Sequence, residues 1–373
     1  MINKQLNTFQ ALETITVQAP GRSCLFGDHQ DYLGLPVIAC AIDRHITLVA
    51  KRKTDKTMTI EMPNIGQSRS IDLEAAPGKV EKGDHLLAAM RILEEYGCVP
   101  DAGYDIEIKG NIAINAGTSS SSALVVAWTH FLLAAFGCER PITKEFIARV
   151  SYEAEVEFHG SPGGKMDQYS IGLGNIIFLE TGEEVTYEVF EKELPGLIVA
   201  ESGIPKQTTG VLGELKEKAL LAINKVREKV PGFDLKKVKI DEFPMYVNYV
   251  PDHLKVYLEA ALLNHDITQK ALVEFKRPQL DLEKIGALIN EHHKVLKDYL
   301  KITLPLIDNM VDAALGAGAL GAKIVGSGRG GSIVVLSRDG QQQRVIKALK
   351  DAGAKDAYAV NIDPGAHVIN TKP

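Results

Sequence analysis

The sequence predicts two mixed α+β domains, and three observations lead to this fold class. The chain has 373 residues, enough for two domains of roughly 100–200 residues each. Strand and helix patterns are mixed throughout, and strands are seldom separated by single helices. The pattern also changes near residue 195, where long amphipathic helices begin. We therefore expect two α+β domains, at 1–193 and 194–373.

Turn and helix-stop residues delimit the elements of the first domain. Residues 14–19 alternate polar and apolar and then meet Pro20-Gly21, which is typical of a strand that runs into a turn. Residues 121–136 are apolar on nearly all sides and end at Gly137, which indicates a buried helix. The other expected elements are a β-rich stretch at 36–50, a helix at 83–96, a strand at 104–114, a helix at 143–159, a glycine- and proline-rich loop at 160–166 and a strand at 175–180.

The second domain is expected to begin with a strand at 196–200 and a loop rich in glycine, proline and threonine. Apolar residues then recur at helical spacing. The expected elements are helices at 210–230, 252–275, 282–300 and 304–316, strands at 322–325 and 332–336 around a glycine loop, a helix at 341–352 and a strand at 356–361.

Composition excludes several classes of protein. Hydrophobic residues make up 45% and charged residues 24% of the chain, which excludes a collagen or a mainly disordered protein. The net charge of −6 is too acidic for a general binder of nucleic acid or anionic membranes. No signal peptide or membrane span is apparent, and the four cysteines form no CxxC pair. We expect a cytoplasmic protein that acts on a small molecule, with no nucleic-acid or membrane partner.

The first loop of chemical interest, residues 19–34, places Arg22, Asp28, His29 and Asp31 within ten residues. A hairpin turn with solvated charges is the simpler interpretation. However, an apolar pair separates the arginine from the carboxylates, which favours a strand that buries one face while polar groups line a pocket. Carboxylates and an imidazole held together can bind several hydroxyl groups at once, as a polyol requires.

A second loop carries four consecutive serines, 119–122, directly before the buried helix. One serine suffices to cap a helix N-terminus. The free backbone N–H groups and the positive end of the helix dipole favour a phosphate site there. No GKS or GKT follows, so this is not a Walker A loop.

Two further segments complete the candidate site. Four glycines lie between Gly326 and Gly331, which indicates backbone pressed close to a phosphate or to the other domain. Glu155 lies near a helix end, and Asp167 lies just beyond the glycine-rich loop. A lone glutamate is more often a solvated side chain, so Glu155 gains significance only through its partners.

Together these loops resemble the three signature motifs of the GHMP kinases, the family of galactokinase, homoserine kinase, mevalonate kinase and phosphomevalonate kinase. The resemblance extends over essentially the whole chain, and its details are most similar to the galactokinase (sugar 1-kinase) branch. It rests on Ala-Pro-Gly-Arg22, Gly27 to Tyr32, Thr118 to Ala123, Ala154-Glu155, Met166-Asp167-Gln168 and Gly326 to Gly331. The family fold pairs a domain like ribosomal protein S5 domain 2 with a ferredoxin-like C-terminal domain, and ATP and substrate bind between them.

The resemblance implies ATP-dependent phosphorylation of the anomeric hydroxyl of an aldose, a monosaccharide, with Mg²⁺ as cofactor. Asp167 would take or orient the proton of the attacking hydroxyl, and Arg22 beside it would offset negative charge. Ser122 and Glu155 would hold the metal. The phosphates would lie on Gly117, Thr118, Ser119, Ser120, Ser121 and Ser122, and the sugar on Asp28, His29, Asp31 and the backbone near Gly164.

Departures from the galactokinase pattern leave alternatives open. Asp28 stands where galactokinases carry glutamate, and no tyrosine occurs between Ser202 and Leu220. A mevalonate kinase-like enzyme is one alternative, favoured by the segment 202–206, although Arg22 replaces the lysine usual there. The other is a catalytically silent sugar sensor, which retention of Asp167 and of the metal ligands disfavours. Arg329 is expected either to face solvent or to lie near an anionic ligand.

Overall fold

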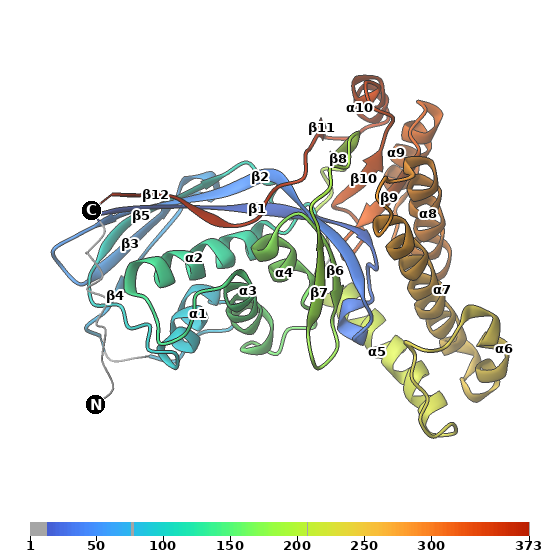
Figure 1. Ribbon diagram of the computed structural model, residues 1–373, viewed down its shortest axis with the longest axis horizontal. Coiled ribbons are helices and arrows are strands. Elements are labelled where there is room, and N and C mark those ends of the chain that lie inside the picture. Colours follow the sequence, from blue (N-terminus) through green and yellow to red (C-terminus); the bar gives the residue numbers. More distant parts are fainter. Residues whose placement is uncertain (1–12, 76–77, 207, 373) are drawn as a thin grey trace.

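The computed structural model describes residues 13–75, 78–206 and 208–372 (Figure 1). These residues form one eight-stranded sheet and one four-stranded sheet. Helices cover both sheets, so the predicted α+β class is confirmed.

The first sheet is built on two long antiparallel strands, β1 (Thr14–Phe26) and β2 (Val37–Arg52). Its order is β12-β1-β2-β5-β3-β4, with β6 pairing β2 and β7. The remaining strands are β3 (Thr57–Met62), β4 (Gln67–Asp72), β5 (Tyr104–Gly110), β6 (Ile176–Glu180), β7 (Thr186–Phe190) and β12 (His367–Lys372).

Four helices lie on one face of this sheet (Figure 1). They are α1 (His85–Glu94), α2 (Ser120–Phe136), α3 (Lys144–Tyr152) and α4 (Met166–Leu173). The central helix α2 buries Trp128 and Phe131 completely, as its all-round apolar pattern predicts. Its N-terminus is therefore fixed firmly relative to β1, on which it packs.

The second sheet is antiparallel throughout, in the order β11-β8-β10-β9. Helices α8, α9 and α10 pack against it, and α7 packs against α8 and α5. The strands are β8 (Leu197–Glu201), β9 (Gly321–Val325), β10 (Ser332–Leu336) and β11 (Asp356–Ala359). The helices are α5 (Thr208–Arg227), α6 (Phe243–Tyr246), α7 (Asp252–Phe275), α8 (Leu282–Lys294), α9 (Pro305–Gly316) and α10 (Gln342–Asp351).

The prediction of a turn at Pro20-Gly21 is wrong, because β1 continues through these residues to Phe26. The strand register shifts between Pro20 and Gly21, as in a β-bulge. A Cβ atom on Gly21 would lie 3.0 Å from the carbonyl oxygen of Thr118. Glycine in the strand thus allows the serine-rich loop to approach the β1 backbone.

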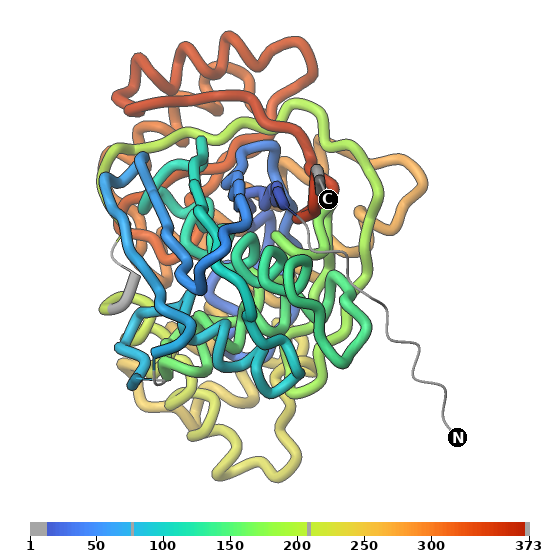
Figure 2. Tube along the Cα trace, turned by 90° about the vertical axis from the view of Figure 1, so that its left-hand side faces the viewer, coloured from blue at the N-terminus to red at the C-terminus, as the bar shows by residue number. Residues whose placement is uncertain are grey.

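Several elements are not predicted from the sequence, namely β3, β4, β7, β12, α4 and α6. The most consequential is β12, which pairs antiparallel with β1. Figure 2 shows the C-terminal chain returning to the first strand. The first sheet therefore includes residues of the expected second domain, and the boundary at 193/194 stays a prediction.

The two sheets share a continuous hydrophobic core. One buried cluster joins Cys24, Leu25 and Phe26 at the end of β1 to Ile198 of β8 and Ile324 of β9. The loops that follow β1 and β9 are consequently held against each other. Within the described ranges, no helix combines the length and the apolar character needed to cross a bilayer.

Candidate active site

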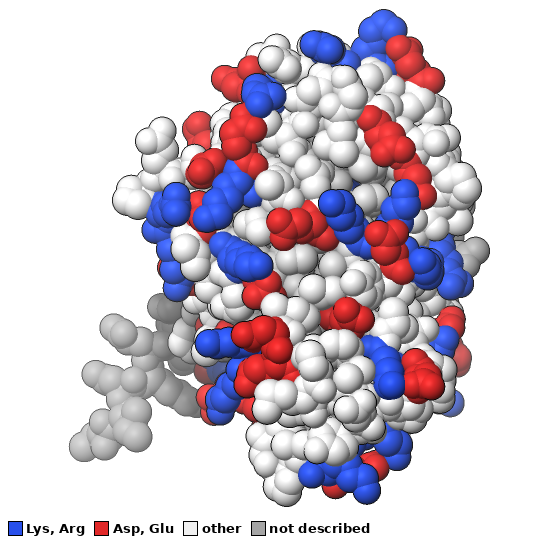
Figure 3. Space-filling model, turned by 90° about the vertical axis from the view of Figure 1, so that its right-hand side faces the viewer, with Lys and Arg blue, Asp and Glu red and all other residues white. Residues whose placement is uncertain are grey.

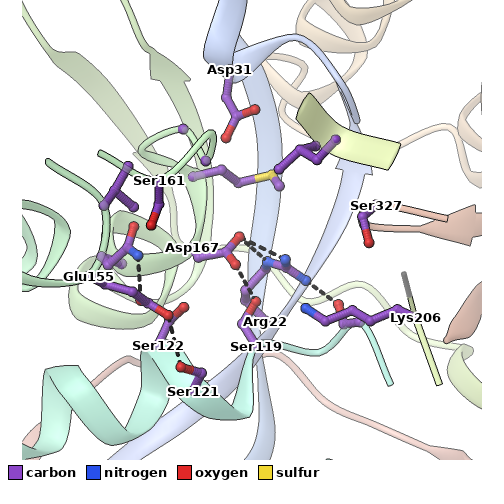
Figure 4. Close-up of a pocket in the computed structure, with 18 of the residues that line it drawn as sticks. Arg22, Asp31, Ser119, Ser121, Ser122, Glu155, Ser161, Asp167, Lys206 and Ser327 are labelled. Atoms are coloured by element: carbon purple, nitrogen blue, oxygen red, sulfur yellow. Dashed lines mark hydrogen bonds and ion pairs between the residues drawn. The ribbon is translucent and has the colours of Figure 1, made fainter. Parts of the chain in front are cut away.

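A cavity lies where loops from both sheets meet (Figure 4). Its walls come from the end of β1, the N-terminus of α2, the segment before α4, the β8–α5 loop and the β9–β10 loop. The structure brings nearly all predicted site residues to this cavity: Arg22, Asp28, His29, Asp31, Gly117, Ser119, Ser120, Ser121, Ser122, Glu155, Gly164 and Asp167. Thr118 is the exception.

Asp167, in the first turn of α4, lies at the centre of a tight hydrogen-bonded group. Its Oδ1 accepts from Nε and Nη2 of Arg22, both at 2.7 Å, and its Oδ2 accepts from the Ser119 hydroxyl at 2.6 Å. Burial acts to raise the pKa of Asp167, but the Arg22 charge and the Ser119 hydrogen bond outweigh it and lower that pKa. Asp167 is therefore a carboxylate at neutral pH.

The backbone next to Arg22 explains why this residue points into the cavity. The Arg22 amide donates to the carbonyl of Thr118 at 3.2 Å, and its Nη1 donates to the carbonyl of Gly117. The Thr118 side chain is 2% exposed and does not line the cavity. Thr118 thus contributes its backbone to the site, by holding Arg22.

The N-terminus of α2 faces the cavity without a side-chain cap. Ser119 occupies the N-cap position with φ 59°, yet its hydroxyl makes no capping hydrogen bond and instead donates to Asp167. The first-turn N–H groups of α2 therefore have no side-chain acceptor. Such a helix end attracts anions, phosphate in particular.

Glu155 lies in a π-helical turn, Glu153–Glu157, that extends α3. Its carboxylate accepts from the Ser121 hydroxyl at 2.9 Å and from Gln168 Nε2 at 2.6 Å. Both Glu155 and Ser122 line the cavity. No cluster of three or more His, Cys, Asp or Glu side chains suited to a metal is found in the described ranges. The oxygen donors present suit Mg²⁺, which usually takes few protein ligands and completes its shell with phosphate and water.

Asp31 opens the 3-10 turn after β1 and reaches the cavity from the side opposite α2 (Figure 4). Burial and then the nearby charge of Asp167 raise the pKa of Asp31 to about 6. A Cβ atom on Gly164 would lie 2.2 Å from Asp31 Oδ2. Asp31 thus lies close to the Gly164 backbone and to Asp167, and its assignment to a sugar site stays a prediction.

Asp28 differs from Asp31, because protein groups occupy both of its carboxylate oxygens. Lys323 Nζ lies 2.5 Å from Oδ2, and the Gly326 amide donates to Oδ1 at 2.7 Å. Burial alone would raise the pKa of Asp28, but Lys323 and other donors lower it to about 2. The neighbouring His29 is also buried, and burial lowers its pKa to about 4. Its Nδ1 lies 3.0 Å from the Tyr32 hydroxyl, while its buried Nε2 has no partner in the described structure.

The cavity residues that sequence reasoning did not assign to the site include His85, Ser161, Lys206 and Ser327. Lys206 belongs to the segment 202–206, which differs from the galactokinase pattern. That difference was the sequence signal that could have identified Lys206. Ser327 lies among the glycines of the third loop. Arg329 is not among the residues that line the cavity, and its amide donates to the carbonyl of Ile302.

Comparison with known proteins places this site in a family. The model of the GHMP kinases N terminal domain matches residues 84–175, and that of the GHMP kinases C terminal domain matches 269–355. The galactokinase galactose-binding signature matches 6–52. The chain belongs to the GHMP kinase family. It is therefore an ATP-dependent phosphotransferase, as the motifs predict.

Individual relatives of this GHMP kinase span nearly its whole length. Galactokinase from Thermotoga neapolitana is 28% identical over 361 residues, which cover 93% of this chain and 95% of the relative. The structure of Lactococcus lactis galactokinase complexed with galactose gives a TM-score of 0.84 at 23% identity, with 96% of each chain covered. Methanococcus jannaschii mevalonate kinase gives 0.69 at 19% identity, with 95% and 98% covered. The two structures establish the shared fold.

Proposed function

We propose that this GHMP kinase transfers the γ-phosphoryl group of ATP to the anomeric hydroxyl of an aldose and so forms a sugar 1-phosphate and ADP. The observation that carries this proposal is the arrangement of Asp167, Arg22 and Asp31 around one cavity. The curated relative from Thermotoga neapolitana, a galactokinase, supports a sugar as the acceptor.

Asp167 acts on the attacking hydroxyl. Its ionised Oδ atoms accept the hydroxyl proton and orient the oxygen toward the γ-phosphorus. As the new O–P bond forms, the bond between the γ-phosphorus and the bridging oxygen of ADP breaks. Because the Arg22 charge keeps the pKa of Asp167 low, orientation of the hydroxyl contributes more than basicity does.

The nucleotide phosphates lie on the N-terminus of α2, where Gly117 and Ser119 to Ser122 line the cavity. Ser122 and Glu155 would hold Mg²⁺ here, and the ion would neutralise charge on the phosphates. Thr118 is assigned no contact with phosphate, since its side chain is buried outside the cavity lining.

Asp31, His29 and the Gly164 backbone bind the sugar hydroxyls. The Asp31 carboxylate lines the cavity and accepts from the Tyr32 amide, whereas both oxygens of Asp28 are bound by Lys323 and Gly326. We therefore assign Asp28 a supporting role in this loop. The far end of the sugar is then bound differently here than in galactokinases, which carry a glutamate at the position of Asp28.

The surroundings fit a small-molecule acceptor and a reducing compartment. All four cysteines are free thiols, which suits the cytoplasm. Positive and negative side chains are interspersed over the face in Figure 3. That distribution gives no support to a nucleic-acid partner.

A sugar panel tests the proposal directly. Wild-type protein with MgATP is assayed for ADP formation with aldoses, with mevalonate and with no acceptor. We expect stimulation by at least one aldose, and Asp167→Asn should lower kcat about 10²–10⁴-fold. Stimulation by mevalonate alone would favour the mevalonate kinase-like alternative. Equal, negligible rates in wild type and Asp167→Asn would favour the sugar sensor.

A further inference from the structure

Lys206 reaches the cavity from the β8–α5 loop, on the side opposite α2 and α4 (Figure 4). Backbone hydrogen bonds fix the loop that carries it. The Gly331 amide donates to the carbonyl of Ile204 at 2.8 Å, and the Ser202 amide donates to the carbonyl of Gly331 at 2.9 Å. The Lys206 amide itself donates to the carbonyl of Asn115 at 3.1 Å. Lys206 is thus tied both to the third glycine loop and to the loop before α2.

Glycine in the third loop is what permits this contact. A Cβ atom on Gly330 would lie 2.7 Å from the carbonyl oxygen of Ile204 and 2.8 Å from that of Pro205. Gly330 also has φ +128°, which other residues rarely adopt. The sequence left open whether these glycines approach phosphate or protein. Gly330 approaches protein, namely the loop that carries Lys206.

The Lys206 ammonium is partly buried and points toward Arg22 and Asp167 (Figure 4). Within the described parts of the chain, it forms no hydrogen bond or ion pair. Burial lowers the pKa of Lys206, while the charges of Asp167 and Glu155 act to raise it and that of Arg22 to lower it. The ammonium therefore lies within electrostatic reach of both the proposed base and the proposed metal ligand. Lys323, the buried lysine beside this site, is by contrast paired with Asp28.

All three guanidinium nitrogens of Arg22 already donate to protein acceptors, so a second cation has a role to fill at the phosphoryl group. Nε and Nη2 donate to Asp167, and Nη1 donates to Gly117. In phosphoryl transfer, charge develops on the equatorial oxygens of the transferred group, and fixed cations aimed at it stabilise the transition state.

We propose that Lys206 contacts the transferred phosphoryl group as a second catalytic cation beside Arg22. This inference rests on the proposed kinase function. The Lys206 ammonium, which points toward Arg22 and the base, meets the γ-phosphoryl group of ATP and retains the contact as that group passes to the sugar oxygen. ADP lacks the group and makes no such contact.

Two substitutions at Lys206 and one control test this role. Lys206→Met removes the charge at similar volume, and Lys206→Arg retains it. Lys218→Met removes the same charge from α5 at a site where the ammonium pairs with Glu214 at 2.5 Å. For Lys206→Met we expect kcat to fall about 10²–10³-fold, with the sugar KM within about threefold of wild type. Lys206→Arg should recover part of kcat, and Lys218→Met should match wild type.

Calorimetric binding of ADP and of the non-hydrolysable β,γ-imido analogue of ATP, both with Mg²⁺, gives a readout independent of turnover. Lys206→Met should weaken the analogue about tenfold or more and leave ADP within about twofold. Equal analogue binding in wild type and Lys206→Met overturns the inference, as does an unchanged kcat. If wild type phosphorylates no aldose, the proposed sugar function fails, while the binding comparison still decides the role of Lys206. Unchanged ADP binding also shows that the variant is folded.

Discussion

Asp28 and Asp31 lie three residues apart in one loop, yet their environments are opposite. Asp28 is 1% exposed and has Lys323 and Gly326 as partners, and its pKa falls to about 2. Asp31 faces the cavity near a second carboxylate, and its pKa rises to about 6. The difference comes from neighbours far away in sequence rather than from the loop itself. One carboxylate is paired inside the protein, and the other lies at the cavity wall.

The largest effect should come from breaking the Asp28–Lys323 pair. Asp28→Asn leaves the fully buried Lys323 ammonium without a counter-charge, so we expect a loss of about 3–5 kcal/mol in the free energy of unfolding. Urea denaturation measures this loss. The double variant Asp28→Asn/Lys323→Met should lose less than Asp28→Asn alone, because the unpaired charge is gone. An unchanged stability together with a raised sugar KM would instead make Asp28 a substrate ligand.

Asp31→Asn should give the converse result. The variant keeps its shape but loses the charge that strengthens hydrogen bonds to sugar hydroxyls, bonds worth about 1.5–3 kcal/mol each. We expect the sugar KM to rise about 10–100-fold, while the KM for ATP changes little. Stability should not fall, because removing the charge relieves repulsion from Asp167. Steady-state kinetics and thermal unfolding check both points, and an unchanged sugar KM would remove Asp31 from the sugar site.

A pair of adjacent glycines tests the position of Asp31 without changing its chemistry. A Cβ atom on Gly164 would lie 2.2 Å from Asp31 Oδ2, whereas one on Gly163 would meet only the two methyl groups of Val156, at 3.5 and 3.9 Å. Gly164→Ala should therefore displace the carboxylate and raise the sugar KM about tenfold, an amount equal to about 1.4 kcal/mol. Gly163→Ala is the matched control and should resemble wild type. Equal kinetics in the two variants would contradict the proposed sugar position.

The sequence predicted the residue types of the site far better than their partners. The order of the motifs was sufficient to bring Arg22, Glu155 and Asp167 to one cavity, and the apolar pattern of 121–136 was sufficient for α2. Asp28 was expected to bind sugar, because nothing near it in sequence shows that Lys323 approaches it. Likewise β12 escaped prediction, since its partner β1 lies at the other end of the chain. Such long-range pairs depend on tertiary packing, which local patterns do not encode.

The smallest expected effect is a pH dependence that differs between Asp31 and Asp28. Because ionised Asp31 is the form that accepts from sugar hydroxyls, kcat/KM should fall about twofold as the pH drops from 7.5 to 6, following a pKa near 6. The Asp31→Asn variant should lose this inflection.

The two carboxylates should also affect stability in opposite directions. The raised pKa of Asp31 means that the folded state binds more protons than the unfolded state between about pH 4 and 6, so the contribution of Asp31 to the free energy of unfolding declines as the pH rises through that window. Asp28 has the opposite sign, because its lowered pKa gives stability above about pH 4 that is lost toward pH 2. Acid titration of unfolding for wild type, Asp28→Asn and Asp31→Asn distinguishes these windows, and an inflection near pH 6 that persists in Asp31→Asn would assign it to another group.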